Sequence, residues 1–235
     1  WIDHMVRRGN IVVYGIYQRP LLELPWRFTS NAVAIIKAAR KTLNRCRPVR
    51  AQLEKCAFLG HSAGAVVSAN LAAQWEAFGI PKPSALMGVQ PGAGMAFKPG
   101  IPFADLSKIP SSLLMLMVSG EHDALVGSNN AIRIYKGASS LPKKNRNFVL
   151  MKTDRHGMPW VHSGHFSPVT MGRRRITTID WFGYWKLFDG LCDAAFTGKN
   201  RKYALGNTRE QRHMGTWSDG VPVIEMKVVT DPGRI

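Results

Sequence analysis

The sequence predicts an α/β protein with a mostly parallel sheet flanked by helices and a helical C-terminal extension. Up to residue 152, short apolar runs alternate with segments of helical periodicity, which favours strands joined by helical crossovers. One apolar run passes through a Gly-His-Ser-Ala-Gly turn directly into an Ala-rich helical segment. After residue 171, aromatic residues recur at helical spacing instead. We therefore expect residues 1–171 to form the core and residues 172–235 an extension packed on the same domain.

Length and composition allow one domain with a full core. The chain has 235 residues, of which 45% are hydrophobic, and no apolar run approaches the ~18 residues that would span a bilayer. We therefore expect a soluble protein without a transmembrane segment. The chain opens on Trp1 rather than Met, which leaves room for a targeting segment upstream. The sequence indicates neither a compartment nor an oligomeric state.

The charge is strongly basic but dispersed. Thirty-two Lys and Arg against fifteen Asp and Glu give a net charge of +17, which is compatible with an anionic partner. No nucleic-acid-binding motif accompanies the basic clusters, so we expect solvated basic faces and no specific nucleic-acid partner. The clusters lie at Arg40-Lys41, Lys143-Lys144-Asn145-Arg146, Arg173-Arg174-Arg175 and Lys199-Asn200-Arg201-Lys202.

The cysteines argue against a zinc site or a disulfide framework. Cys46, Cys56 and Cys192 make an odd count without a C-x-x-C spacing. Cys56 lies in a predicted buried strand, where it is expected to act as a small apolar filler. No metal and no cofactor are expected.

The first elements are a helix, a strand and a second helix. Residues 1–8 end in basic side chains that suit the negative end of a helix, and Gly9 is expected to stop it. Residues 10–17 are predicted as a strand. Residues 29–45 carry apolar residues on one helical face, with cap candidates at residues 29–31.

The middle of the chain is expected to supply the main strands. Residues 57–59 suit a strand buried on both faces, and helical spacing continues through Trp75. A Pro- and Gly-rich connection at residues 90–110 is expected to shape the rim of a pocket. Further strands are predicted at residues 84–88, 113–118 and 147–152, the last of them closing the main sheet.

The C-terminal part is expected to be helical. Aromatic residues at helical spacing over residues 179–191 predict an amphipathic helix that packs on the core. Residues 207–211, Asn-Thr-Arg-Glu-Gln, are typical of a capped helix start. Residues 231–233 are expected to belong to a frayed tail.

The turn at Ser62 points to nucleophilic chemistry. A serine between a buried strand and a helix can hold a strained conformation that lifts its hydroxyl above the sheet edge, and small neighbours at Gly60 and Gly64 let strand and helix pass close together. The backbone N–H of Ala63, at the start of the helix, can then donate to a developing oxyanion. The alternative is a glycine-rich turn with an ordinary serine.

This Gly-His-Ser-Ala-Gly turn resembles the nucleophile elbow of the α/β-hydrolase superfamily, and more loosely of its esterase, dienelactone-hydrolase and lipase-like branches. The resemblance covers residues 9–170. A serine alcohol needs an imidazole base held by a carboxylate. The resemblance implies that these groups follow in the chain order Ser, then Asp or Glu, then His. It also implies a small-molecule or lipid-like ester substrate.

The acid is expected at the end of the strand at residues 113–118. There, Gly120-Glu121-His122-Asp123-Ala124-Leu125-Val126 resembles the family's Gly-x-x-Asp-x-x-Val turn. Asp123 is therefore the candidate acid, since functional carboxylates in parallel sheets lie beyond the C-terminal ends of strands. Glu121 and Asp105 are alternatives, more simply explained as exposed loop carboxylates.

Three histidines compete for the role of base. The segment at residues 154–168 resembles a hydrolase pattern in which Asp-x-His-Gly-x-Pro is followed by a histidine, an aromatic residue and a proline. His165 is the candidate base, and His162 is the alternative. His156 is expected to hydrogen-bond within its loop, and His61 is expected to be a packing residue. No H-E-x-x-H motif supports a metal site at these histidines.

The resemblance leaves one component without a candidate. In this superfamily the second oxyanion donor comes from a loop after an early strand, and no such motif precedes Gly9. We therefore expect the N-terminal strands to be missing, or else a donor within residues 9–30. The sequence favours a serine hydrolase that cleaves a carboxylic ester through an acyl-enzyme, and amide or thioester hydrolysis would use the same machinery. A catalytically incomplete binding or scaffold protein of the same fold is the alternative.

Overall fold

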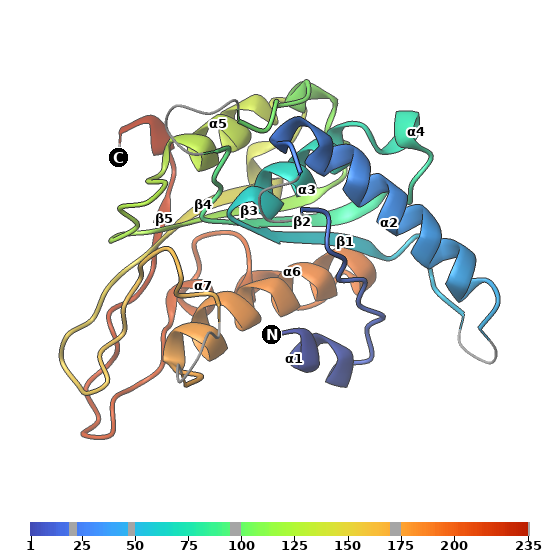
Figure 1. Cartoon of the computed structure of the whole chain (residues 1–235). Coiled ribbons are helices and arrows are strands. Elements are labelled where there is room, and N and C mark those ends of the chain that lie inside the picture. Colours follow the sequence, from blue (N-terminus) through green and yellow to red (C-terminus); the bar gives the residue numbers. More distant parts are fainter. Residues whose placement is uncertain (19–22, 47–49, 95–99, 170–174, 235) are drawn as a thin grey trace.

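A five-stranded sheet lies between two helical layers in the computed structural model (Figure 1), which describes residues 1–18, 23–46, 50–94, 100–169 and 175–234. The strands follow one another across the sheet in chain order, and only the last is antiparallel. The prediction of a mostly parallel sheet flanked by helices is confirmed. The strands are β1 (Cys56–His61), β2 (Pro83–Val89), β3 (Leu114–Gly120), β4 (Arg146–Met151) and β5 (Lys227–Val229).

The helices divide between the two faces of the sheet (Figure 1). One face carries α2 (Phe28–Leu43), α3 (Ala63–Ala73) and α5 (Asn129–Gly137), and the other carries α1 (Ile2–Arg7), the π-helix Ile179–Trp185 and α6 (Lys186–Thr197). The short helices are α4 (Trp75–Phe78) and α7 (Arg209–Arg212). Single 3-10 turns lie at Pro25–Arg27, Leu106–Lys108, Lys143–Asn145, Arg201–Tyr203 and Pro232–Arg234.

Strand β3 shows how the sheet separates two cores. All of its residues are buried, and its side chains alternate between the faces because successive strand residues point in opposite directions. Leu116 and Val118 pack in the core that includes α6, whereas Met115 and Met117 pack in the core that includes α2, α3 and α5. A central strand covered on both faces therefore reads as a continuous apolar run.

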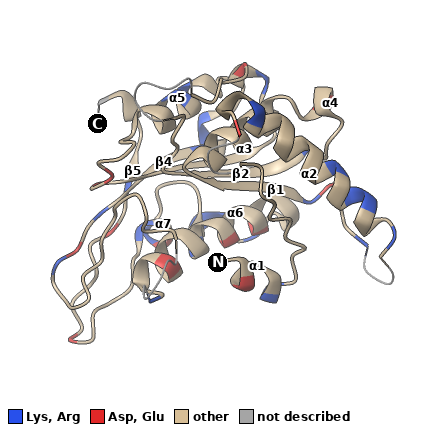
Figure 2. Ribbon diagram, viewed as in Figure 1, with Lys and Arg blue, Asp and Glu red and all other residues tan. Residues whose placement is uncertain are grey.

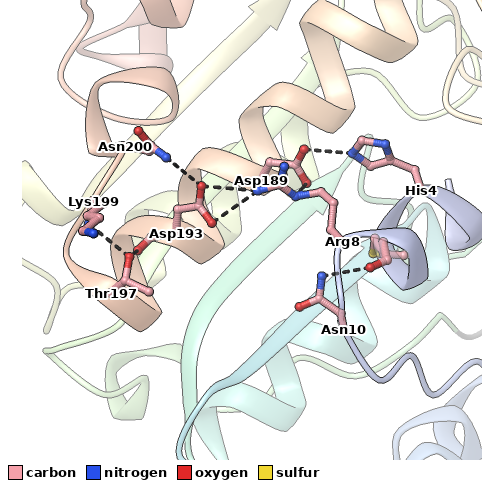
Figure 3. A network of polar contacts seen from close by, with 9 residues as sticks. His4, Arg8, Asn10, Asp189, Asp193, Thr197, Lys199 and Asn200 are labelled. Atoms are coloured by element: carbon pink, nitrogen blue, oxygen red, sulfur yellow. Dashed lines mark hydrogen bonds and ion pairs between the residues drawn. The ribbon is translucent and has the colours of Figure 1, made fainter.

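A polar network joins α1 to α6 beneath the sheet (Figure 3). His4 Nε2 lies 2.8 Å from Asp189 Oδ2, and Arg8 forms ion pairs with Asp189 and Asp193 at 3.2 and 3.4 Å. Burial raises the pKa of Asp189, and the contacts with His4 and Arg8 oppose that rise. Partly exposed pairs of this kind contribute about 0–1 kcal/mol each. The apolar contacts of Trp1 and Met5 with the core that includes α6 therefore contribute more to docking α1.

The strand predicted at residues 10–17 is absent. This segment has no regular secondary structure and hydrogen-bonds to no strand among the described residues, and Tyr14 and Ile16 are each 81% exposed. Its β-branched and aromatic residues favour a strand, but a strand forms only beside a partner. Strand β1 forms an edge of the described sheet, which explains why its residues are only partly buried and not enclosed on both faces as expected.

Smaller corrections concern element ends. Residues 29–31 do not cap α2, because the helix begins at Phe28 and they lie in its first turn. The helix after the Ser62 turn does not run on through Trp75, since α3 ends at Ala73 and α4 begins at Trp75. The sheet does not close at β4, because β5 adds an antiparallel strand beside it. The helix end predicted at Gly9 and the capped helix start predicted at residues 207–211 are confirmed.

The structure also shows the state of the cysteines and the distribution of the basic side chains. The three cysteines are free. Lys and Arg are spread over several elements rather than gathered on one (Figure 2), and Arg173 and Arg174 lie outside the described residues. None of the described helices is both long and apolar enough to cross a membrane.

Candidate active site

The turn between β1 and α3 holds Ser62 in a strained conformation. Its φ of 53° and ψ of −122° lie in a region that non-glycine residues rarely adopt, at a cost of about 1–3 kcal/mol. The surrounding structure enforces this geometry. The Ser62 N–H donates to the Val89 carbonyl of β2 at 3.0 Å, and a Cβ at Gly60 would overlap the carbonyl of Gly64. Only glycine at residue 60 lets strand and helix approach this closely.

Three side chains from separate loops form one hydrogen-bonded chain at this turn. His165 Nε2 lies 3.0 Å from Ser62 Oγ, and His165 Nδ1 lies 2.9 Å from Asp123 Oδ2. The side chain of Asp123 is fully buried and that of His165 is 6% exposed. The structure thus brings together the serine, acid and base candidates that the sequence predicted, in the order of contacts that nucleophilic catalysis requires.

The loop after β3 holds the Asp123 carboxylate in one orientation. Its Oδ1 accepts the backbone N–H groups of Leu125 and Val126, each at 3.1 Å. Its other oxygen is thereby turned toward His165. This carboxylate lies beyond the C-terminal end of a parallel strand, the position where such sheets place functional groups.

The acid loop and the histidine loop are joined to each other beyond the ends of β3 and β4. Thr153 Oγ1 lies 2.9 Å from Ser163 Oγ and 2.7 Å from His122 Nδ1. The backbone N–H of His122 also donates to the Ser163 carbonyl, at 3.3 Å. Because β3 and β4 are adjacent and parallel, their following loops meet at the same edge, and these contacts fix the spacing between Asp123 and His165.

Two polar side chains that the sequence analysis missed hold the backbone around His165. His61 Nε2 donates to the His165 carbonyl at 2.8 Å, and Gln90 Nε2 donates to the Gly164 carbonyl at 2.9 Å. Burial lowers the pKa of His61, opposed in part by its bond to the His165 carbonyl. His61 is therefore more than a packing residue. Gln90, fully buried at the end of β2, was detectable as a polar residue following an apolar strand.

The alternative candidates lie in other contacts. His162 stacks on His122 with ring centroids 5.9 Å apart. The backbone N–H of His156 donates to Asp154 of its own loop at 2.9 Å, and His156 Nε2 contacts Asp219 at 2.7 Å. Glu121 binds Lys152 and the Thr153 N–H, and these bonds outweigh burial and lower its pKa. Asp105 caps the turn at Ser107, which lowers its pKa. None of these contacts connects to Ser62.

The space around the Ser62 hydroxyl is bounded by three elements. Ala63 is the first residue of α3, so its N–H has no partner within the helix. A Cβ on Gly92 would lie 3.1 Å from Ser62 Oγ, which shows that the loop after β2 passes directly over the hydroxyl. On the other side, the Tyr17 hydroxyl lies 3.2 Å from the position that a Cβ on Gly64 would take. Burial raises the pKa of Tyr17 to about 12.

A cavity of about 820 Å³ opens beside His165. Aromatic and aliphatic side chains form most of its wall, and Arg175 also lines it. The described residues that line it are His122, Ala124, Leu125, Pro159, Trp160, His162, Gly164, His165, Phe166, Ser167, Arg175, Thr177 and Ile179. Within the described ranges, no cluster of three or more His, Cys, Asp or Glu side chains is arranged to hold a metal ion.

Comparison with known proteins gives partial structural likenesses. No family model and no curated protein matches the sequence. The chain is similar to MGS-M1, an α/β hydrolase enzyme from a Medee basin deep-sea metagenome library, with 20% identity and a TM-score of 0.42 over 59% of this chain and 53% of that one. A structure described with LipS and LipT, two metagenome-derived lipolytic enzymes, is 12% identical with a TM-score of 0.39, over 63% of this chain and 67% of the other.

A third likeness is to the esterase domain of a Rhodothermus marinus protein, with 14% identity and a TM-score of 0.34 over 57% of this chain and 58% of that one. The chain thus spans between 53% and 67% of the length of these structures. The assignment of the site rests on the geometry of Ser62, His165 and Asp123.

Proposed function

We propose that the protein is a serine hydrolase that cleaves carboxylic esters through an acyl-enzyme intermediate. The observation that carries the proposal is the continuous chain from Ser62 Oγ to His165 to Asp123, with contacts of 3.0 and 2.9 Å, built on a serine at positive φ. A chance arrangement would not account for a strained backbone at the same residue. The α/β-hydrolase resemblance of the Gly-His-Ser-Ala-Gly turn supports the same assignment.

In the first step Ser62 Oγ attacks the ester carbonyl carbon while His165 Nε2 takes the hydroxyl proton. Asp123 accepts the Nδ1–H of His165, which leaves Nε2 free to act as base and stabilises the imidazolium that forms. The tetrahedral intermediate then breaks its bond to the alcohol oxygen, which receives the proton from His165. In the second step water attacks the acyl carbon while His165 takes its proton. The second tetrahedral intermediate then breaks its bond to Ser62 Oγ, which receives that proton, and the acid is released.

Donors for the oxyanion come from both sides of the Ser62 turn in this proposal. The Ala63 N–H, at the positive end of α3 and next to Ser62, is the candidate for the first donor. The Tyr17 hydroxyl is the candidate for the second donor, because it lies against Gly64 and has no hydrogen-bond partner among the described residues. Its raised pKa keeps it protonated near neutral pH, so that it can donate.

Tyr17→Phe is expected to lower kcat for a simple aryl ester by about 10- to 1,000-fold, with little change in KM, because an oxyanion donor acts mainly in the transition state. Steady-state kinetics against the parent measure this split. Tyr14→Phe is the matched control, since the Tyr14 side chain is 81% exposed. A Tyr17→Phe effect confined to thermal stability would remove Tyr17 from the oxyanion site.

Pre-steady-state kinetics test the acyl-enzyme. Mixing the protein with excess 4-nitrophenyl acetate is expected to release a burst of about one equivalent of 4-nitrophenol, followed by slower turnover, because this activated ester acylates Ser62 faster than water deacylates it. Ser62→Ala should lose both phases. Absence of any 4-nitrophenol release above the Ser62→Ala background would favour the scaffold alternative.

A further inference from the structure

The cavity beside His165 has the form of a binding site for part of the ester, and this inference rests on the proposed function. It holds about 820 Å³, within the range of small-molecule pockets. Two of its wall residues, Trp160 and Phe166, are 43% and 59% exposed, although large aromatic side chains usually bury more of their surface. Leu125 on the same wall is also exposed. A flat apolar ligand would cover these side chains.

The position of the cavity favours the alcohol part of the ester over the acyl part. His165 lines the cavity, whereas Ser62, 3.0 Å from His165 Nε2, is not among the described lining residues. The base must return its proton to the alcohol oxygen, so the departing alcohol has to lie on the side of His165. A group in this cavity is therefore attached to the oxygen that leaves.

The charge of the cavity is positive. Among the described residues that line the cavity, Arg175 is the only Lys, Arg, Asp or Glu. Its side chain is exposed. The other titratable groups there are His122, His162 and His165. Asp180, the nearest carboxylate after Arg175 in the sequence, is buried, does not line the cavity and accepts the Thr177 N–H at 2.8 Å.

The rim of the cavity adds a second positive charge. The Arg155 guanidinium lies 5.0 Å from the centre of the Trp160 ring, on a wall residue of the cavity. The nearby carboxylates are already engaged, Asp123 with His165 and Glu121 with Lys152. An anionic group on the ligand would therefore meet cations without an opposing carboxylate on the described wall.

We propose that this cavity receives an aromatic alcohol bearing a carboxylate, and that Arg175 is the residue that selects the negative charge. The planar guanidinium can form two parallel hydrogen bonds to a carboxylate, while Trp160 and Phe166 contact the ring. The substrate class is then an ester of a hydroxylated aromatic acid, with the ester bond on the hydroxyl.

The test compares 4-acetoxybenzoate with 4-acetoxybenzamide, which have the same acyl group and nearly the same shape but differ in charge on the leaving alcohol. Arg175→Gln is expected to lower kcat/KM for the carboxylate about 10- to 100-fold relative to the amide, the range for hydrogen bonds to charged groups. Arg175→Lys should retain part of the preference, because it keeps the charge but loses the planar fork. The quantity compared is the carboxylate-to-amide ratio of kcat/KM in each variant, divided by the same ratio in the parent. This division cancels the difference in intrinsic reactivity of the two esters.

Arg7→Gln is the matched control, because it removes one exposed positive charge from α1, outside the cavity wall. It should leave the ratio within about twofold, as expected for a screened distant charge. An equal loss for both esters in Arg175→Gln, or no loss, would overturn the assignment of Arg175. If the parent cleaves neither ester while a fluorophosphonate still labels Ser62, the alcohol-site inference fails and the proposed nucleophile stands. Loss of that labelling as well would overturn the proposed function itself.

Discussion

Ser62→Ala is expected to lower the turnover of a simple aryl ester by about a millionfold, to the level set by binding and the oxyanion donors alone. Among the residues that the structure describes, only the Ser62 hydroxyl lies both at the strained turn and 3.0 Å from the base, so none of their side chains can replace it. The measurement is steady-state hydrolysis of 4-nitrophenyl acetate by parent and variant. The fold should be retained, since alanine removes a single oxygen atom.

Ser139→Ala, at an exposed serine outside the site, is the matched control and should keep parental activity. Circular dichroism and thermal unfolding of both variants separate a loss of chemistry from a loss of structure. A Ser62→Ala protein that retains more than about one per cent of parental turnover would show that another group carries the reaction.

His165→Ala is expected to have the second-largest effect, a loss of about 10⁴- to 10⁶-fold in kcat, because the serine then lacks its base and the leaving alcohol its acid. His156→Ala is the control, since its pair with Asp219 lies away from Ser62. His162→Ala should act more weakly, through substrate contact in the cavity. A ranking in which His162→Ala is the severe variant would move the base three residues upstream.

Asp123→Asn extends the same prediction to the acid. The expected loss is about 10⁴-fold, because an amide favours the wrong imidazole tautomer while leaving the geometry intact. The Asn side-chain oxygen can still accept the N–H groups of Leu125 and Val126, so unfolding stability should change little. Glu121→Gln is the control, since Glu121 contacts Lys152 and not His165.

Local signals in the sequence predicted much of the fold. The apolar runs became β2, β3 and β4, and Gly9 ends α1 at a φ of 84°, a backbone conformation that glycine tolerates. The residues at the Ser62 turn were also predictable. Gly60 is required by a contact with its near neighbour Gly64, so the motif carries that geometry within five residues.

The rest depends on contacts between distant segments. Residues 10–17 have strand-forming composition, but whether they pair depends on a neighbour that no local pattern specifies. Strand β5 is three residues long and joins the sheet only through its antiparallel pairing with β4. His61 and Gln90 hold the His165 loop by donating to backbone carbonyls. The sequence shows Gln90 as a polar residue after an apolar strand, but it does not specify which carbonyl either side chain reaches.

The central claim, that Ser62 is an activated nucleophile, is tested most directly by reaction with a fluorophosphonate followed by peptide mapping. The account predicts one adduct, on the peptide that contains Ser62, which is lost in Ser62→Ala and forms far more slowly in His165→Ala. The reagent needs no knowledge of the natural substrate. An adduct on a different residue, or labelling that survives Ser62→Ala, would contradict the account.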